Sequence, residues 1–230
     1  MRTIVLDTET TGLDPKSGHR IVEIGCVELH HGLPTGQVYH VYLNPQRSMP
    51  VEAFKVHGLS EEFLSDKPLF HEIVDDFIDF IKQDPLIIHN ARFDMKFLNA
   101  ELEKCDKPLL PFEQAIDTLA IAKQKFPGSP VNLDALCRRF QIDNSSRVKH
   151  GALLDAEILA EVYLELLGGR QTTFDLGEAK KSHQRTENSA QNTAREHIRP
   201  ERFFPATQEE LSAHAQFLTK IKNPIWEQMG

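Results

Sequence analysis

The sequence predicts a mixed α/β fold, in which helices flank a sheet, followed by a flexible linker and a short C-terminal helix. Three observations predict it: β-branched and apolar segments in the front part, helical periodicity in the middle part, and a sharp loss of apolar residues after residue 169. Strands that come first as a meander, and then alternate with helices, are typical of a mixed sheet with helices on its faces.

Short apolar segments bounded by Gly, Pro or Asn define the expected strands. We expect strands over residues 3–8, 21–29, 38–43 and 86–89. Apolar residues that recur every three or four positions define the helices. We expect helices over residues 69–81, 93–102, 117–125, 133–140 and 152–167, the last of them capped by Gly168 and Gly169. Together these elements predict one domain over residues 1–169.

The tail beyond this domain has a different composition. Between residues 177 and 200 the only large aliphatic residue is Ile198, and such a segment buries too little apolar surface to offset its loss of conformational entropy. We therefore predict a short peptide over 170–176, a flexible linker over 177–202 and a partner-binding segment over 203–230.

A short helix is expected within the last segment, because Thr207 and Glu210 form a capping-box pattern. Trp226 follows this helix. The apolar residues of the helix fall on one face, and they are Leu211, Ala215, Leu218 and Ile221. A single helix of this kind cannot form a core of its own, so we expect it to bind a partner or to fold back on the main domain.

Composition excludes several classes of protein. Forty per cent of the residues are hydrophobic, which is enough for a packed core, yet no run of 18 apolar residues predicts a membrane span. The first residues turn acidic too soon for a signal peptide. The three cysteines are widely spaced and form no zinc-binding cluster with histidine. These features predict a cytoplasmic protein with reduced thiols.

The charge of the chain is concentrated in its front part. The whole chain has a net charge of −8, and residues 1–168 carry 17 Lys and Arg against 26 Asp and Glu. Such a surface argues against a protein that grips duplex DNA by its phosphates alone. The acidity has two interpretations. Either it serves solubility, or some of the carboxylates bind cations that in turn contact a phosphate group of the substrate.

The first candidate site residues are Asp7 and Glu9, which lie on an expected strand. Residues two apart in a strand face the same side, so these carboxylates project together at roughly 6–7 Å. They repel each other unless a cation or a proton lies between them. The alternative is a frayed strand end in which both groups are solvated.

Three further residues could join this pair, although each has an ordinary alternative. Asp155 lies on the inward face of the helix over 152–167, where a carboxylate needs a metal ion or a basic partner. His150 precedes that helix and is otherwise a surface or capping histidine. Asp94 lies where a buried strand is followed by a helix. Its ordinary alternative is an acidic residue that the helix dipole favours in the first turn.

In combination these residues indicate a metal-dependent reaction. Carboxylate oxygens without thiolates are ligands that suit Mg²⁺ or Mn²⁺. Two such ions, about 4 Å apart, stabilise both the attacking and the leaving oxygen when a phosphodiester is cut. A neutral histidine can take a proton from the attacking water.

These residues also resemble the motifs of a known family. Asp7-x-Glu9, Asn90-x-x-x-Asp94 and His150-x-x-x-x-Asp155 are similar to the three exonuclease motifs of the DEDDh branch of the DnaQ-like nucleases. The resemblance covers residues 1–168 and implies a ribonuclease-H-like fold and two-metal-ion 3′→5′ exonuclease activity that releases nucleoside 5′-monophosphates.

The resemblance also implies roles for these residues. Asp7, Glu9 and Asp155 would hold the first metal ion, Asp7 with Asp94 the second, and His150 would be the general base. Other positions resemble places where the family contacts the terminal nucleotide, and they are Thr8, Thr10, Gly12, His57 and Phe93. Turn geometry explains Gly12 equally well, and core packing explains Phe93.

Within this family the chain most resembles the proofreading exonucleases of bacterial replicative DNA polymerases. The likeness extends through residues 51–58, 133–137 and 155–164. It implies that the substrate is a primer 3′ end. The peptide just past the domain resembles one that docks on the sliding clamp, and its residues are Gln171, Thr172, Thr173, Phe174, Asp175 and Leu176. The start of a linker is the plainer interpretation of this peptide.

The C-terminal segment resembles the tether to the polymerase (alpha) subunit. The residues expected at that contact are Leu211, Leu218, Ile221 and Trp226. Tethering raises the local concentration of a nuclease that has little basic surface. The sequence leaves open whether a small accessory subunit also binds the front domain.

Two other interpretations remain at this point. The chain could be a free-standing DEDDh exonuclease that trims single-stranded DNA or RNA, although the long tail argues against it. It could also be a non-catalytic adaptor between clamp and polymerase, although such a protein has no use for facing carboxylates.

Overall fold

The computed structural model describes residues 1–145, 147, 149–169 and 206–219. The chain divides into two units, Met1–Leu176 and Gly177–Gly230, and each is considered by itself. Within the described residues, no helix is long and apolar enough to cross a membrane.

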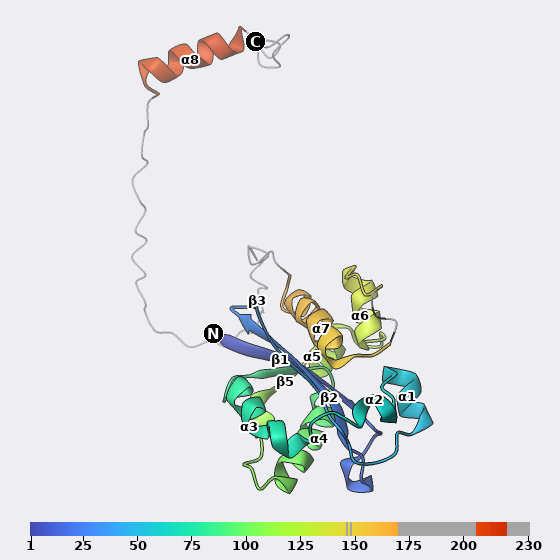
Figure 1. Cartoon of the computed structure of the whole chain (residues 1–230). Helices are drawn as coiled ribbons and strands as arrows, with labels where there is room; N and C mark the ends of the chain where they lie inside the picture. Colours follow the sequence, from blue (N-terminus) through green and yellow to red (C-terminus); the bar gives the residue numbers. More distant parts are fainter. Residues whose placement is uncertain (146, 148, 170–205, 220–230) are drawn as a thin grey trace, which may run out of the picture. The chain divides into compact units, whose positions relative to one another are not determined.

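The first unit is built on a mixed sheet of five strands, in the order β3-β2-β1-β4-β5 (Figure 1). Strands β1, β2 and β3 form an antiparallel meander, whereas β4 pairs in parallel with both β1 and β5. The strands are β1 (Arg2–Thr10), β2 (Ile21–His30), β3 (Leu33–Tyr42), β4 (Leu86–Ile88) and β5 (Ala115–Asp117). Strand β1, which carries the first two candidate carboxylates, therefore lies at the centre of the sheet.

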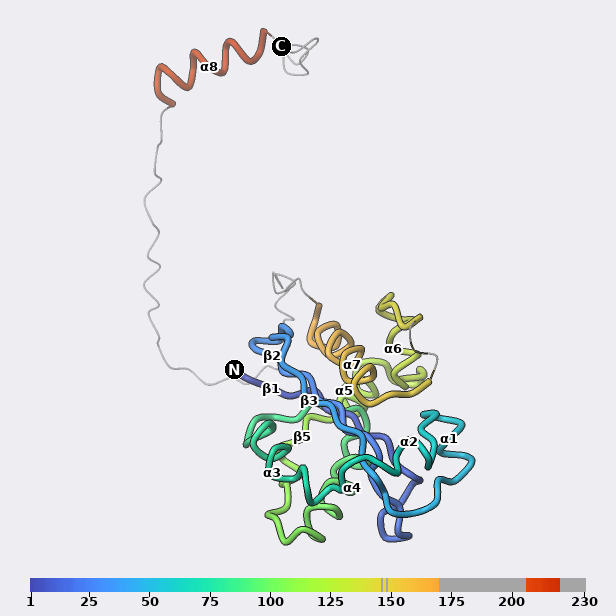
Figure 2. The backbone as a smooth tube through the Cα atoms, in the orientation of Figure 1, coloured from blue at the N-terminus to red at the C-terminus, as the bar shows by residue number. Residues whose placement is uncertain are grey.

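Helices cover both faces of this sheet (Figure 2). The first unit contains α1 (Val51–His57), α2 (Glu61–Leu64), α3 (Phe70–Ile81), α4 (Ala91–Lys104), α5 (Thr118–Lys125), α6 (Leu133–Phe140) and α7 (Ala152–Leu166). Side chains of α3 and α4 form one buried cluster with Ile4 and Leu6 of β1. Side chains of α5, α6 and α7 form a second cluster around Val5. Alternate residues of β1 thus enter different cores, as the period of two requires.

The predicted fold class is confirmed, with some differences in the elements. All four expected strands and all five expected helices of the domain are present. The elements missed from the sequence are the α-helices α1 and α2, the strand β5 and two short 3-10 helices, Pro15–Ser17 and Phe112–Gln114. The signals for α1 were present, since Pro50 precedes it and Gly58 ends it in the left-handed conformation with φ 78°. Strand β5 has only three residues, too few to show an alternating apolar pattern in the sequence. It is recognised as a strand by its parallel pairing with β4.

In the second unit the structure describes one helix, α8 (Gln208–Leu218). The predicted capping box is present: the Thr207 hydroxyl accepts from the Glu210 amide at 3.2 Å, and the Glu210 carboxylate accepts from the Thr207 amide at 2.8 Å. Leu211 is 50% exposed, and Leu218 is partly buried. The other predicted features of the tail lie outside the described residues, namely the peptide 171–176, the linker 177–202, Ile221 and Trp226.

Candidate active site

Strand β1 delivers Asp7 and Glu9 to one side of the sheet. Leu6 points into the core formed with α3 and α4, whereas Val5 points into the core formed with α7. Asp7 and Glu9 lie two and four residues after Val5, so they share its side of the sheet. Glu9 is buried, with 8% exposure, and Asp7 is partly accessible. The spacing of two therefore brings both carboxylates to the α7 side, as the sequence predicted.

A glycine on the neighbouring strand allows α7 to reach these carboxylates. Gly25 of β2 is the pairing partner of Asp7. A Cβ atom on Gly25 would stand 2.2 Å from the backbone nitrogen of Leu153, in the first turn of α7. Because glycine has no Cβ, that turn lies directly against the sheet. Asp155 lies two residues after Leu153 and is 3% exposed. One of its carboxylate oxygens lies within 4.8 Å of a carboxylate oxygen of Glu9.

Helix α4 supplies the fourth carboxylate from the other side of β1. Its N-cap residue, Asn90, has a left-handed backbone with φ 68°. Asp94 in the first turn is 3% exposed, and its Oδ1 accepts hydrogen bonds from the amide of Thr8 at 3.1 Å and from the hydroxyl of Thr8 at 2.7 Å. Thr8, which was predicted as a substrate contact, also holds Asp94 in place through its hydroxyl.

Burial, and then the charges of neighbouring carboxylates, raise the pKa of Asp7 and Glu9. Burial, and then the charges of Asp94 and Glu9, raise the pKa of Asp7 well above its ordinary value. Burial, followed by repulsion from Asp155, raises the pKa of Glu9 to about 8. Burial also raises the pKa of Asp94 to about 7, against the hydrogen bonds from Thr8. Bound cations would relieve this repulsion.

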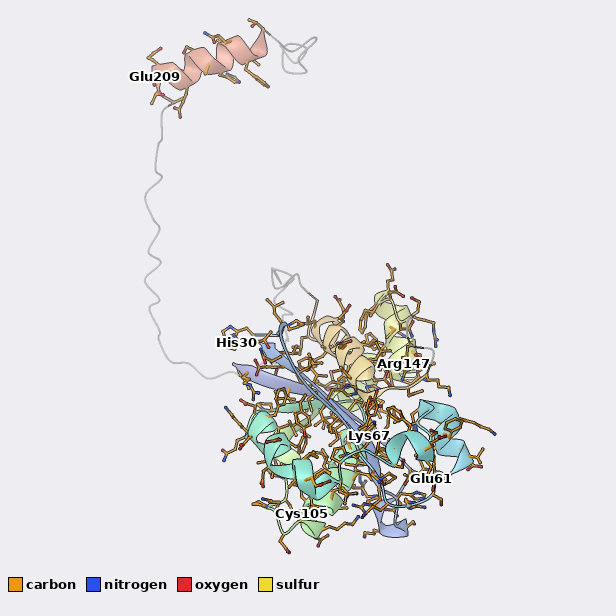
Figure 3. The ribbon with its side chains drawn as sticks, in the orientation of Figure 1. His30, Glu61, Lys67, Cys105, Arg147 and Glu209 are labelled. Carbon is orange, nitrogen blue, oxygen red and sulfur yellow. The ribbon has the colours of Figure 1, made fainter. Side chains whose placement is uncertain are left out.

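Asp155 differs from the other carboxylates, because it has a basic partner. Burial alone would raise its pKa, but the hydrogen bonds from Arg147 and the proximity of His150 more than offset that effect, and its pKa is lowered. Arg147, labelled in Figure 3, donates to Asp155 through Nε at 2.5 Å and Nη2 at 2.7 Å. The sequence interpretation required a metal ion or a basic partner for Asp155, yet it did not single out Arg147.

The donor set fits a divalent cation that prefers oxygen ligands. Glu9, His150 and Asp155 each offer one ligand atom, and these atoms lie within 4.8 Å of one another. The side chain of His150 is 47% exposed, and its Nδ1 lies 3.4 Å from Oδ2 of Asp155. Among the described residues, Asp7 and Asp94 stand outside this set. Each nevertheless raises the negative potential of the site, which suits Mg²⁺ or Mn²⁺.

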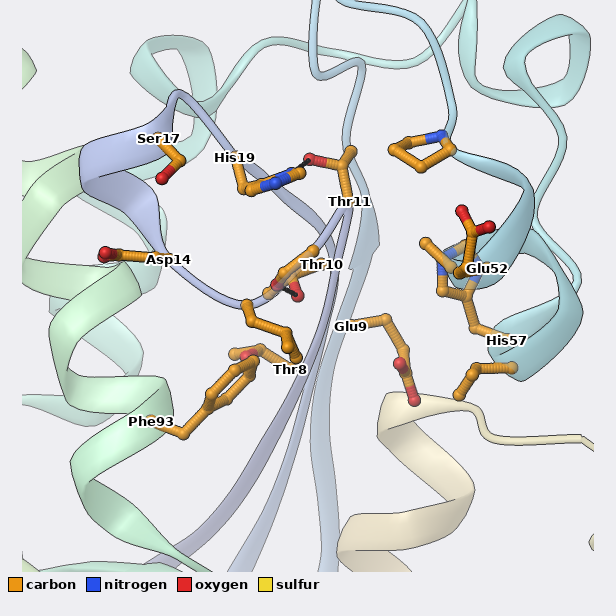
Figure 4. A pocket seen from close by; sticks show the side chains of 15 residues that line it. Thr8, Glu9, Thr10, Thr11, Asp14, Ser17, His19, Glu52, His57 and Phe93 are labelled. Atoms are coloured by element: carbon orange, nitrogen blue, oxygen red, sulfur yellow. Dashed lines mark hydrogen bonds between the residues drawn. The ribbon is translucent and has the colours of Figure 1, made fainter.

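A pocket of about 520 Å³ opens beside the carboxylates. Figure 4 shows Phe93 on α4 and His57 on α1 approaching from opposite sides, with Glu9 between them. All five residues predicted to contact the terminal nucleotide line this pocket, namely Thr8, Thr10, Gly12, His57 and Phe93. The hydroxyl of Thr10 donates to the carbonyl of Gly12 at 2.6 Å, so it shapes the pocket wall.

His57 is a buried polar group at the edge of this pocket. The side chain is 5% exposed, and its Nδ1 accepts from the amide of Leu59 at 3.0 Å. Its proton therefore lies on Nε2 in the neutral ring. Within the described part of the chain, Nε2 has no hydrogen-bond partner. Burial lowers the pKa of His57, against an opposing effect of the Thr10 backbone, so the buried ring favours its neutral form at the edge of the pocket.

Comparison with known proteins defines the family. The family described as "Exonuclease" matches residues 4–163. The DNA polymerase III subunit epsilon of Rickettsia conorii is 52% identical over 228 residues, which are 96% of each chain. That of Escherichia coli K12 is 47% identical over 96% of this chain and 93% of its own. The chain belongs to the DNA polymerase III epsilon subunits. Membership in the epsilon family confirms the predicted class, a 3′→5′ exonuclease of the proofreading type.

Solved structures confirm the ribonuclease-H-like nuclease fold of this epsilon-family chain. The nuclease domain of 3′hExo, a DEDDh family member bound to rAMP, has a TM-score of 0.60 at 20% identity over 72% of this chain and 91% of its own. Exonuclease X in complex with 5′ overhanging duplex DNA has a TM-score of 0.58 at 24% identity, over 72% of this chain and 90% of its own. At such identities the likeness concerns the fold alone.

Proposed function

We propose that the chain removes mismatched nucleotides one at a time from a DNA 3′ end, with two divalent cations bound by Asp7, Glu9, Asp94 and Asp155. One observation carries the proposal: carboxylates from β1, α4 and α7 meet beside a pocket lined by Phe93 and His57. Bound cations would relieve their mutual repulsion, and the pocket has room for a nucleoside.

The carboxylates divide between two cation positions. Asp7, Glu9 and Asp155 would hold the first ion, and Asp7 with Asp94 would hold the second. Two ions held by these residues would supply Lewis acidity to the phosphate. Thr8 supports the second position, because its amide and hydroxyl both orient the carboxylate of Asp94. Mg²⁺ and Mn²⁺ both suit these oxygen ligands.

His150 is the general base in this proposal. It lies just before α7, half exposed at the rim of the carboxylate cluster, where water has access. The ring takes a proton from a water molecule while the water oxygen attacks the phosphorus. The bond between phosphorus and the 3′ oxygen of the preceding nucleotide breaks, and that oxygen leaves with the shortened strand. The terminal nucleotide departs as a nucleoside 5′-monophosphate.

The pocket beside the carboxylates accepts the terminal nucleoside. The ring of Phe93 offers an apolar surface against which a base or sugar can pack. The Nε2–H of His57 offers a hydrogen bond to an acceptor atom of the nucleoside. With a volume of about 520 Å³ the pocket has room for one unpaired nucleotide, which favours a frayed and therefore mismatched end over a stable duplex.

The tail gives this acidic nuclease its access to DNA. We assign the peptide 171–176 to a sliding clamp and the segment around Leu211, Leu218, Ile221 and Trp226 to a polymerase (alpha) subunit. Exposed Leu211 on α8 supports a partner-binding role. A tethered nuclease needs little DNA affinity of its own, because its local concentration at the primer end is high. These partners place the enzyme in the cytoplasm with the replication machinery.

The test is degradation of a 3′-mismatched primer–template by the full chain with Mg²⁺, beside the His150→Ala and Asp7→Ala variants. Stepwise loss of 3′ nucleotides is expected, and loss of the general base should lower the rate by about a hundredfold or more. Arg20→Gln, which removes an ion pair outside the site, is a control for general damage. A folded wild type that degrades no DNA or RNA with either metal would leave only the adaptor interpretation.

A further inference from the structure

Arg147 has no role in the proposed reaction, yet it makes polar contacts with three residues in and beside the site. Its Nε and Nη2 donate to the two oxygens of Asp155, at 2.5 and 2.7 Å. Its Nη1 donates to Oδ1 of Asp134 at 2.8 Å, and Nη2 also lies 2.8 Å from Nδ1 of His150. The side chain is 7% exposed. The guanidinium is thus buried between two carboxylates and the predicted general base.

These contacts use the same atoms that a metal ion needs. Both oxygens of Asp155 accept from Arg147, and Asp155 belongs to the set of possible ligands with Glu9 and His150. The positive charge of Arg147 also acts on Asp7 and on Glu9, lowering the pKa of each against the repulsion of the carboxylates. A guanidinium and a divalent cation repel each other strongly when they share one carboxylate at short distance.

The contact with His150 affects its chemistry as well. Arginine can only donate, so Nδ1 of His150 accepts this hydrogen bond, and the proton of the neutral ring lies on Nε2. Neither ring nitrogen is then free to accept a proton from water. His150 becomes available as a base only when Arg147 releases it.

Asp134 provides a place to which Arg147 can remain bound. It lies on α6, its side chain is 43% exposed, and its Oδ1 also accepts from Asn144 at 3.0 Å. Asp134 stands outside the set of possible metal ligands. Arg147 therefore has one carboxylate inside the site and one outside it.

We propose that Arg147 is the resident counter-cation of the metal-free site, and that it releases Asp155 and His150, while staying on Asp134, when a divalent ion binds. This inference rests on the proposed metal site. It makes Arg147 a positioning residue that acts through Asp155 and His150. In the metal-free protein Arg147 partly neutralises the carboxylates and occupies the base, and the affinity for metal is lowered by the cost of displacing it.

Substitutions of Arg147 and of its outer partner Asp134 should change the affinity for Mn²⁺ in opposite directions. Arg147→Gln removes the competing cation, so the full chain should bind Mn²⁺ about tenfold more tightly than the wild type. Asp134→Asn removes the outer partner and leaves Arg147 with Asp155, so Mn²⁺ should bind several-fold more weakly. The double variant should match Arg147→Gln, because Asp134 acts only through Arg147. Arg147→Lys keeps the charge and should stay within about threefold of the wild type.

The measurement is calorimetric titration of the full chain with Mn²⁺, together with the melting temperature before and after Mn²⁺ is added. Arg20→Gln is the matched control, since Arg20 makes a comparable two-point ion pair with buried Glu101 at 2.6 and 2.7 Å. It should lower the melting temperature without changing the affinity. Should Arg147→Gln misfold, the exposed Asp134→Asn variant still tests the proposal through its weaker binding.

The outcomes separate this inference from the proposed function. Tighter binding by Arg147→Gln and weaker binding by Asp134→Asn support the exchange of cations. Weaker or unchanged binding by a folded Arg147→Gln would show that Arg147 supports Asp155 in the loaded site as well, which overturns the inference and leaves the exonuclease proposal intact. Absence of any Mn²⁺ binding by the wild type would overturn both.

Discussion

Gly25 lies directly beneath the backbone of Leu153: a Cβ on this glycine would stand 2.2 Å from the Leu153 nitrogen and 2.5 Å from the carbonyl oxygen of Ala152. Because Gly25 is also the strand partner of Asp7, this contact sets the distance between α7 and the carboxylates of β1. The absence of one side chain on β2 therefore determines where Asp155 lies.

The substitution Gly25→Ala should accordingly damage both stability and activity. The added methyl forces α7 away from the sheet, which costs about 1–3 kcal/mol of unfolding free energy. A displacement of about 1 Å at Asp155 and His150 should lower the exonuclease rate by about a hundredfold. Thermal melting and single-turnover digestion check the two effects.

Gly151→Ala is the control for that change in stability. Gly151 caps the same helix with φ −152°, and nothing lies within 4 Å of its added Cβ. Its melting temperature should stay close to that of the wild type. Equal destabilisation by the two alanines would show that close packing at Gly25 is not the cause.

Thr8→Val tests the support of Asp94. Valine preserves the shape of threonine but removes the hydroxyl that donates to Asp94 at 2.7 Å. The cost of a hydrogen bond to a charged group, about 1.5–3 kcal/mol, should appear mainly as an increase of about tenfold or more in the Mg²⁺ concentration for half-maximal activity. Thr8→Ser should restore it. A Thr8→Val enzyme with the metal dependence of the wild type would contradict this role.

The metal-free protein should lose stability as the pH rises. The pKa of Glu9 is raised to about 8 and that of Asp94 to about 7, so the folded state holds more protons than the unfolded state between roughly pH 4.5 and 8. The free energy of unfolding therefore decreases through that range. The lowered pKa of Asp155 affects stability only at acid pH, as protonation removes its pairing with Arg147.

Melting temperatures in EDTA, measured from about pH 6 to 8.5, should fall with pH. Saturating Mg²⁺ should flatten the curve, because bound cations keep the carboxylates ionised in the folded state. Glu9→Gln should make the curve less steep without metal, because the raised pKa values of Asp94 and Asp7 still contribute. A stability in EDTA that rises through this range would contradict the proposed charge balance.

His57→Phe tests the neutral N–H donor in the nucleotide pocket. Phenylalanine keeps a ring in the buried position but removes Nε2, which has no partner in the described part of the chain. We expect KM for a single-stranded oligonucleotide to rise about tenfold, the cost of one lost hydrogen bond, with a smaller change in kcat. His57→Gln, which retains an N–H donor, should recover part of the affinity. Unchanged KM in His57→Phe would remove His57 from the proposed contacts.

The placement of the carboxylates could be predicted from the sequence where local periodicity sufficed. A spacing of two places Asp7 and Glu9 on one side of a strand, and the helical period places Asp155 on the buried face of α7. Both follow from backbone geometry that neighbouring residues share, so no tertiary information is needed. The loop residue Arg147 belongs to no such period, and nothing in its neighbours shows that it turns toward Asp155.

By itself, the sequence determined the class of fold, the facing carboxylates, the motif set and the distinct composition of the tail, because each depends on residues close together along the chain. Only the tertiary structure decided the strand order, the pairing of β5 with β4, the close contact of α7 with Gly25, and the ion pairs of Arg147 with Asp155 and Asp134. These contacts join segments far apart in sequence or turn a loop residue inward, and their energies depend on packing and burial that exist only once the chain has folded.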